Sequence, residues 1–76
     1  MMELEIKELI HDISLMDIEA INNTDEIGND VIIGIPHLLE FIIGLEDILD
    51  DDIPDEDTEK WRTVQDVIDY INKRIE

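Results

Sequence analysis

The apolar positions near the N-terminus repeat with the period of an amphipathic helix. Ile6, Leu9, Ile10 and Ile13 fall at i, i+3, i+4 and i+7, with Met2 one turn earlier. Residues at these spacings share one face of an α-helix, and that face is buried against another element. The pattern predicts a helix over residues 2–13, with Ser14 at its end.

Between Leu15 and Gly34 this periodicity stops, and turn-forming residues dominate. Asn22–Asp25 and Gly28–Asp30 are of the types that break regular structure. A structureless excursion of about 20 residues is uncommon in a compact domain. We therefore expect the three isoleucines of this segment to anchor the loop on the core: Ile18, Ile21 and Ile27.

A second helical pattern begins near Pro36, which suits the first turn of a helix because its missing N–H has no partner to lose there. The predicted helix covers residues 35–49. Its inward stripe is Leu38, Phe41, Ile42, Leu45, Ile48 and Leu49. Ile35, Leu39 and Ile43 form a second stripe, which one buried face cannot absorb. We expect a neighbouring element or a partner to cover it.

The last third of the chain predicts one short and one longer helix. Asp50–Asp52 end the preceding helix, and residues 53–57 indicate a turn into a short helix through Lys60. Thr63 with Asp66 three residues later is close to a capping box, followed by apolar positions at helical spacing up to Ile75.

The fold predicted for residues 1–76 is therefore a single all-α domain with three longer helices and one short helix. No segment has the alternation of a strand, and no internal repeat is visible. Trp61 falls between the last two helices, where we expect it to be packed in or against the core.

Composition narrows the classes of function. The 76 residues carry 22 acidic and 5 basic side chains, for a net charge of −17, and no cysteine. Such a polyanion cannot neutralise phosphates, which argues against nucleic acid and anionic membranes and favours a basic protein partner or a divalent cation. The absence of cysteine excludes disulfides, thiolate catalysis and zinc ribbons. With no signal-peptide pattern and no apolar run of membrane-spanning length, we expect a cytoplasmic protein.

The acidic residues concentrate in the middle of the chain. No Lys or Arg lies between Lys7 and Lys60, whereas residues 8–59 contain 17 acids. This stretch is either a solvated surface or a docking face for a basic partner, and the sequence leaves both open. An EF-hand loop starting at Asp50 would need a Gly at its sixth position and a Glu at its twelfth. These positions are occupied by Asp55 and Trp61, so we predict no specific metal site. We predict no catalytic residues either.

Several segments resemble the acyl carrier proteins. Residues 53–60 and 63–72 resemble the third and fourth helices of bacterial carriers, and Leu45-Glu46-Asp47 resembles the end of the second. Glu19-Ala20-Ile21 is similar to the end of the family's first loop. The resemblance covers essentially the whole chain. It implies a four-helix carrier fold, a non-enzymatic role and partners among the enzymes of acyl-chain metabolism.

The chain departs from this family at the attachment site. The family carries 4′-phosphopantetheine on the serine of an Asp-Ser-Leu motif at the start of helix II. Compared without gaps, that motif falls on Gly34-Ile35-Pro36, whereas a gapped comparison places Val31 at the serine. Neither residue has a hydroxyl, and no Ser or Thr lies between Thr24 and Thr58. We therefore expect no covalent phosphopantetheine.

The family's helix II also carries an acidic and apolar face that docks basic patches of partner enzymes. The resemblance extends this role to Leu39, Glu40, Ile43, Glu46 and Asp47, and to Asp55 and Glu59 in helix III. The acids that flank the serine in carriers are replaced here by Gly34 and His37. Recognition by a phosphopantetheinyl transferase depends on that pattern.

The leading hypothesis is thus a protein-interaction module in fatty acid, lipid or polyketide metabolism. Three alternatives remain. The first is a carrier that holds an acyl chain non-covalently, in a pocket lined by Ile32, Ile33, Ile35, Leu39 and Ile43. The second is a homodimer that buries the extra apolar stripe. The third is a genuine carrier modified at the only serine, Ser14, although 13 residues are too few to supply the family's first helix and loop.

Overall fold

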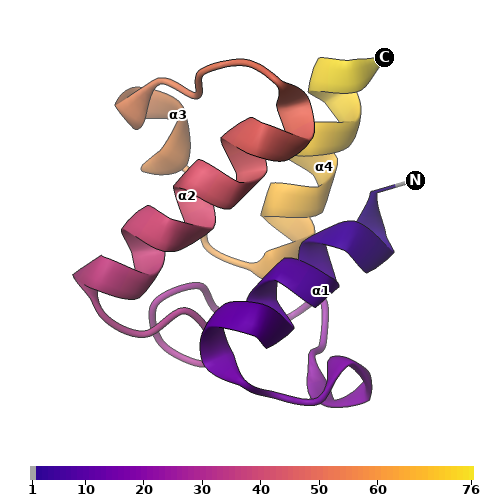
Figure 1. Ribbon diagram of the computed structural model, residues 1–76, viewed down its shortest axis with the longest axis vertical. Coiled ribbons are helices and arrows are strands. Elements are labelled where there is room, and N and C mark those ends of the chain that lie inside the picture. The colour runs from indigo at the N-terminus through magenta and orange to yellow at the C-terminus, as the bar shows by residue number, and fades with distance from the viewer. Residues whose placement is uncertain (1) are drawn as a thin grey trace.

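The computed structural model describes residues 2–76 and contains the predicted all-α bundle of three longer helices and one short helix. The helices are α1 (Glu3–Ser14), α2 (Ile35–Leu49), α3 (Asp55–Thr58) and α4 (Val64–Ile75). Figure 1 shows α2 crossing the molecule between α1 and α3, with the start of α1 and the end of α4 on one side. Within residues 2–76 there is no strand, and no helix is long and apolar enough to cross a membrane.

The core is built from the predicted inward stripes of the three longer helices. These contribute Ile6 and Ile10 from α1, Phe41 and Leu45 from α2, and Val64, Val67, Ile68 and Ile71 from α4. The connecting segments add Ile21, Val31, Ile32, Ile53 and Trp61. Burial of each large aliphatic side chain contributes about 1.5–3 kcal/mol, which makes this cluster the main source of stability in a chain without disulfides.

Helices α1 and α2 approach each other closely at Gly44. A Cβ added to this glycine would lie 2.6 Å from Leu9 Cδ1 and 2.7 Å from Leu9 Cδ2, well inside van der Waals contact. The absence of a side chain at residue 44 therefore lets the two helices pack at this distance, although glycine costs helix stability at an interior position.

The long loop of residues 15–34 is held by both side chains and backbone. Ile21 is buried and Ile27 packs against the core, as predicted. Ile18 is only half-buried and lies outside the core cluster, so the prediction of three anchors was wrong for that residue. Ile18 instead begins a 3₁₀ turn, Ile18–Ala20 (η1), which is too short to show a helical period in the sequence.

The loop is also tied to the start of α4 through its backbone. The Val64 N–H donates to the Asp25 carbonyl at 2.9 Å, and the Ile27 N–H donates to the Arg62 carbonyl at 2.8 Å. These bonds satisfy polar groups that the loop would otherwise leave unpaired beside the core.

The predicted capping box at the start of α4 is present. Thr63 Oγ1 accepts a hydrogen bond from the Asp66 N–H at 3.2 Å, while Asp66 Oδ2 accepts from the Thr63 N–H at 3.1 Å. The same oxygen accepts from the Arg62 N–H at 2.9 Å. These bonds favour the ionised carboxylate and hold the pKa of Asp66 below its ordinary value.

The short helix α3 ends at Thr58 rather than at Lys60, because the chain continues through turns into the buried Trp61. A polar chain of contacts fixes this region to α4. Tyr70 Oη donates to Asp57 Oδ2 at 2.7 Å and accepts from Arg74 Nη1 at 2.6 Å. Arg74 also forms an ion pair with Asp51 at 2.9 Å, so the last turn of α4 holds both α3 and the segment before it.

Candidate functional site

The two residues matched to the family's serine lie in opposite environments. Ile35 is the first residue of α2, and its side chain is 72% exposed. Val31 is 1% exposed and belongs to the core. Of these two positions, only residue 35 is open to a large modifying enzyme, and its side chain offers no hydroxyl.

The residue before Ile35 adopts a conformation typical of glycine. Gly34, the N-cap of α2, has φ +95° and ψ 149°, a region that L-residues with a side chain rarely enter. A side chain at this position would have room, since its Cβ would approach nothing closer than Pro36 Cδ at 3.9 Å. The backbone itself therefore disfavours the aspartate that the family has before its serine.

The hydroxyl of the alternative attachment residue is not accessible. Ser14 is the last residue of α1, and its Oγ is buried with no hydrogen-bond partner within residues 2–76. It borders a cavity of about 310 Å³ that Met16, Ile33 and His37 also line. A transferase would have to open this region before reaching the hydroxyl, so the structure disfavours modification at Ser14.

The predicted partner-binding residues of α2 form an exposed face. Leu39 is 55% and Ile43 is 60% exposed, and with Ile35 they continue the stripe at i, i+4 and i+8. Glu40 and Asp47 are exposed on the same helix. No element of the described chain covers the stripe, so the predicted surplus of apolar positions is on the surface.

Glu46 differs from the other acids of this face. Its side chain is partly buried, and Oε2 accepts a hydrogen bond from the Ile53 N–H at 2.9 Å. One carboxylate oxygen is thereby committed to holding the connection between α2 and α3. Any contribution of Glu46 to docking would come from its charge and its remaining oxygen.

The C-terminal end of α2 forms an acidic hollow of about 430 Å³. Ile43, Glu46 and Asp47 line it together with Asp50, Asp51 and Asp52. So many carboxylates around one concavity create a strongly negative potential. Within residues 2–76, however, no three His, Cys, Asp or Glu side chains are placed to hold a metal ion. The hollow is an electrostatic feature without the geometry of a metal centre.

The predicted residues of helix III are separate from this hollow. Asp55 is the exposed first residue of α3, and Glu59 is exposed immediately after the helix. Neither lines the hollow, although Figure 1 shows α3 lying beside α2. The structure thus brings Ile43, Glu46 and Asp47 together at one concave site, and leaves Asp55 on α3 and Glu59 just after that helix.

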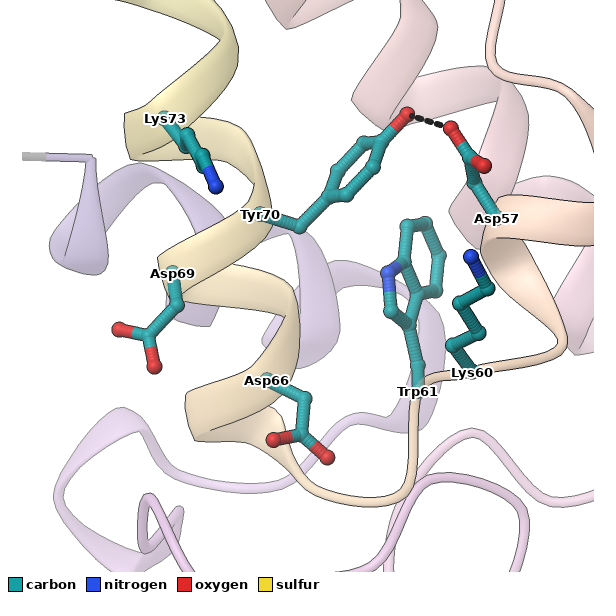
Figure 2. Close-up of a pocket in the computed structure, with 7 residues that line it drawn as sticks. All are labelled: Asp57, Lys60, Trp61, Asp66, Asp69, Tyr70 and Lys73. Atoms are coloured by element: carbon teal, nitrogen blue, oxygen red, sulfur yellow. Dashed lines mark hydrogen bonds between the residues drawn. The ribbon is translucent and has the colours of Figure 1, made fainter.

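A third concave site lies between α3 and α4, and no pattern in the sequence indicated it. Figure 2 shows this groove, of about 400 Å³, around Trp61 and Tyr70. The two rings meet edge to face with centroids 5.4 Å apart. Burial and the hydrogen bond to Asp57 raise the pKa of Tyr70 above its ordinary value. The groove was missed because Trp61, assigned to the core, also presents one edge to it.

Known proteins of similar sequence are acyl carrier proteins, while no protein-family profile matches the chain. The acyl carrier protein of Buchnera aphidicola subsp. Schizaphis graminum is 38% identical over 72 residues, covering 95% of this chain and 91% of the relative. That of Chlorobium phaeobacteroides is 40% identical over 82 aligned positions, covering 97% of this chain and 100% of the relative. That of Lactobacillus acidophilus is 39% identical over 67 residues, covering 88% of this chain and 84% of the relative. Because the similarity extends over most of this chain and most of each relative, the chain belongs to the acyl carrier protein family.

Proposed function

We propose that this protein is an interaction module that carries no covalent phosphopantetheine and presents the acidic and apolar face of α2 and α3 to a basic partner protein. The observation that carries the proposal is an exposed docking-type face without an attachment residue. Ile35, Leu39 and Ile43 are all more than half exposed, yet no Ser or Thr lies between Thr24 and Thr58.

Family membership fixes the general setting of this role. Acyl carrier proteins serve the enzymes of acyl-chain metabolism and are not themselves enzymes, and this chain likewise is not an enzyme. We infer that its partner is one of those enzymes, or a regulator that also meets true carriers, in the cytoplasm.

The physical basis of recognition lies in the alternation along α2. Aliphatic side chains such as Leu39 and Ile43 lose water on contact and supply the apolar centre of an interface. The flanking carboxylates of Glu40 and Asp47 attract a basic patch and speed its encounter. Because these aliphatic and acidic side chains lie on a helix of 15 residues, binding does not require a loop to become ordered.

The first experiment tests the absence of the prosthetic group. The protein is co-expressed with a broad-specificity phosphopantetheinyl transferase and analysed by intact mass. We expect the unmodified mass, because the exposed residue 35 is an isoleucine and the Ser14 hydroxyl is buried. Ile35→Ser, which restores a hydroxyl at the exposed start of α2, is the matched comparison. A mass increase of one phosphopantetheine on the natural sequence would refute this part of the proposal.

The second experiment tests the docking face by competition. The protein is added in excess to a reaction between a true acyl carrier protein and an enzyme that acts on it. We expect inhibition that the double variant Glu40→Lys, Asp47→Lys weakens by at least about tenfold, since like charges across an interface cost several kcal/mol. Glu19→Lys, at an exposed acid on η1, is the control and should inhibit normally. Equal inhibition by all three proteins would refute the assigned face.

One observation favours a second candidate, a carrier that holds an acyl chain without a covalent bond. The cavity of about 310 Å³ beside the start of α2 is lined by Met16, Ile32 and Ile33, among others. Of the five residues expected to line such a pocket, Ile35, Leu39 and Ile43 are instead on the surface. Chemical-shift changes at Met16 and Ile33 with micromolar fatty acid would favour this role, and their absence would count against it.

The apolar stripe also bears on self-association. In a symmetric dimer through α2, Glu40 and Asp47 of the two copies would lie near one another, and their repulsion opposes the contact. Sedimentation equilibrium of the protein alone, at low and moderate salt, tests the homodimer. If only the monomer is present at both salt concentrations, the homodimer is excluded.

A further inference from the structure

The two ends of α2 differ in charge. Residues 31–45 contain a single acid, Glu40, whereas residues 46–52 contain five. The macrodipole of a helix favours acids in the first turn and bases in the last turn. In α2 the first turn has no acid and the last turn has no base, while the acids gather at the negative end of the dipole. This distribution raises the free energy of the folded chain, so the stability of the isolated protein does not account for it.

Most of the acids at this end are free to meet a cation. Glu46 accepts a hydrogen bond from the Ile53 N–H, and Asp51 pairs with Arg74. Within residues 2–76, the carboxylates of the other three have no hydrogen-bond or ion-pair partner: Asp47, Asp50 and Asp52. These three residues are exposed and line the acidic hollow, so the side chain of a partner can reach them.

The opposite end of the exposed face of α2 is apolar. Ile35 and Leu39 are 72% and 55% exposed. Ile43, which is 60% exposed, continues their stripe and also lines the acidic hollow. At 1.5 Å per residue, the stripe from Ile35 to Ile43 is about 12 Å long. The apolar stripe therefore leads into the hollow, and the two form one continuous surface.

We propose that this surface binds an amphipathic helix whose contact face is divided, with aliphatic side chains at one end and Lys or Arg side chains at the other. The aliphatic end packs against Ile35 and Leu39, and the basic end enters the hollow beyond Ile43. This helix belongs to the basic partner of the proposed function, on which this inference rests. The charge at the two ends of α2 also fixes the direction in which the helix binds.

Three features favour a helix of another protein over other occupants. Aliphatic side chains at i, i+4 and i+8 form a ridge of the kind that packs into the grooves of a second helix. Within residues 2–76, no strand offers an edge with which an extended peptide could pair. A second copy of this chain has no Lys or Arg in residues 8–59, so its own α2 could not neutralise the hollow.

Two synthetic peptides of identical composition test the division. Both are Ala-rich helices of about 18 residues, long enough to span α2, with equal numbers of Leu and Lys on one face. In the divided peptide, Leu occupies one half of that face and Lys the other, whereas in the mixed peptide they alternate. In ¹H–¹⁵N spectra of the protein, we expect the divided peptide to bind with a dissociation constant on the order of 0.1 mM, and the mixed peptide at least about fivefold more weakly.

The mixed peptide controls for the attraction of any polycation to this polyanion. The two peptides have the same charge and the same apolar side chains, so general electrostatic attraction would bind them equally. Equal dissociation constants, or no saturable shift with the divided peptide, would overturn the proposal.

The direction of binding gives an independent test. A nitroxide label at the Leu end of the divided peptide should broaden the amide signals of Ile35 and Leu39 most strongly. A label at the Lys end should broaden those of Asp50 and Asp52 most strongly. The reverse order, or the same residues broadened most by both labels, would contradict the proposed direction.

The acidic end is tested by neutral variants. Asp50→Asn with Asp52→Asn removes two free carboxylates of the hollow, and should weaken binding of the divided peptide by about fivefold or more and reduce its salt dependence. Glu19→Gln with Asp69→Asn makes the same change of charge at exposed acids on η1 and α4, and should change binding by less than about twofold. Equal losses with the two double variants would refute the assignment of the hollow.

The apolar end has a matched pair of its own. Ile35→Ser with Leu39→Ser should weaken binding of the divided peptide by about fivefold or more but leave its salt dependence unchanged, since no charge is removed. Leu4→Ser with Ile75→Ser, at exposed aliphatic residues of α1 and α4, should change binding by less than about twofold. Equal losses with both pairs would refute the role of the stripe.

Failure of this proposal is distinguishable from failure of the proposed function. If the protein inhibits the reaction of a true carrier as expected but the two peptides bind equally, only the division of the partner's face is refuted. If inhibition is absent but the divided peptide binds more tightly and in the expected direction, the division stands, and the partner is not an enzyme that also acts on true carriers.

Discussion

At the scale of single residues, Asp66 connects a local sequence signal to the stability of the bundle. Its carboxylate accepts from the Arg62 and Thr63 N–H groups, which would otherwise be unpaired at the start of α4. The same hydrogen bonds lower the pKa of Asp66 in the folded protein relative to its ordinary value of 3.8. Because the folded-state pKa is the lower one, the stabilisation is present above pH 3.8 and is lost as the pH falls through the folded value.

We therefore predict a pH-dependent effect of Asp66→Asn. At pH 7 the variant should lose about 1 kcal/mol of unfolding free energy, the typical value of a helix cap. Below pH 3.8 the difference from the natural protein should narrow. Urea denaturation monitored by circular dichroism measures both. Asp69→Asn, which changes an exposed acid bonded only to a side chain, should have a much smaller effect. A difference that stays constant from pH 7 to pH 3 would contradict the assigned cause.

At the scale of elements, the sequence predicted what has a period or a local chemical signal. The bounds predicted for α2 match the structure, and the capping box of Thr63 and Asp66 is present. The η1 turn was not predicted, since its three residues are shorter than one helical period. The backbone conformation of Ile32 was equally unpredictable. Its φ of +54° is disfavoured for a β-branched residue, and burial of its side chain in the core holds the residue in this conformation.

In the candidate site, too, features with a local sequence pattern were predictable, and features that depend on contacts between elements were not. The spacing of Ile35, Leu39 and Ile43 predicted a second stripe that one buried face cannot absorb, but it left open whether a neighbouring element or a partner covers it. In the structure the three side chains are exposed. The engagement of Glu46 with the Ile53 N–H and the groove at Trp61 depend on contacts between elements, which no local pattern encodes.

The packing of α1 on α2 gives a second prediction. Gly44→Ala should destabilise the protein by about 1 kcal/mol or more, because the clash with Leu9 outweighs the gain in helix propensity. Leu9→Ala removes the obstructing methyl groups. The double variant should therefore lose roughly 1 kcal/mol less unfolding free energy than the sum of the losses of the two single variants. Urea denaturation of all four proteins measures this coupling. Strict additivity would show that Leu9 does not set the approach of the helices.

At the scale of the whole molecule, the dominant quantity is uncompensated negative charge. Against a net charge of −17, residues 2–76 contain two ion pairs, Lys7 with Glu3 and Arg74 with Asp51. The Cα atoms span 27 × 25 × 19 Å. At 0.01 M salt the Debye length of about 30 Å exceeds these dimensions, whereas at 0.15 M it is about 8 Å. At low salt, most carboxylates therefore repel one another across the entire fold.

The third prediction is that the melting temperature rises between 0.01 M and 0.15 M salt, as screening relieves this repulsion. Thermal unfolding followed by circular dichroism measures it. Sodium and tetramethylammonium chloride should act alike, because screening does not depend on ion size. A melting temperature unchanged by either salt would contradict the prediction, and an effect of sodium alone would indicate bound ions instead.

The backbone at Gly34 also constrains how this sequence can evolve. Some isoleucine codons become serine codons by a single base change, so a hydroxyl at residue 35 is within easy mutational reach. The aspartate that precedes the serine in the family can also arise from some glycine codons by a single base change, but a side chain at φ +95° is disfavoured until the turn into α2 changes shape. A lineage carrying this sequence would have to remodel the loop before the full Asp-Ser-Leu motif became tolerable. The order of mutations, more than their number, separates this protein from a conventional carrier.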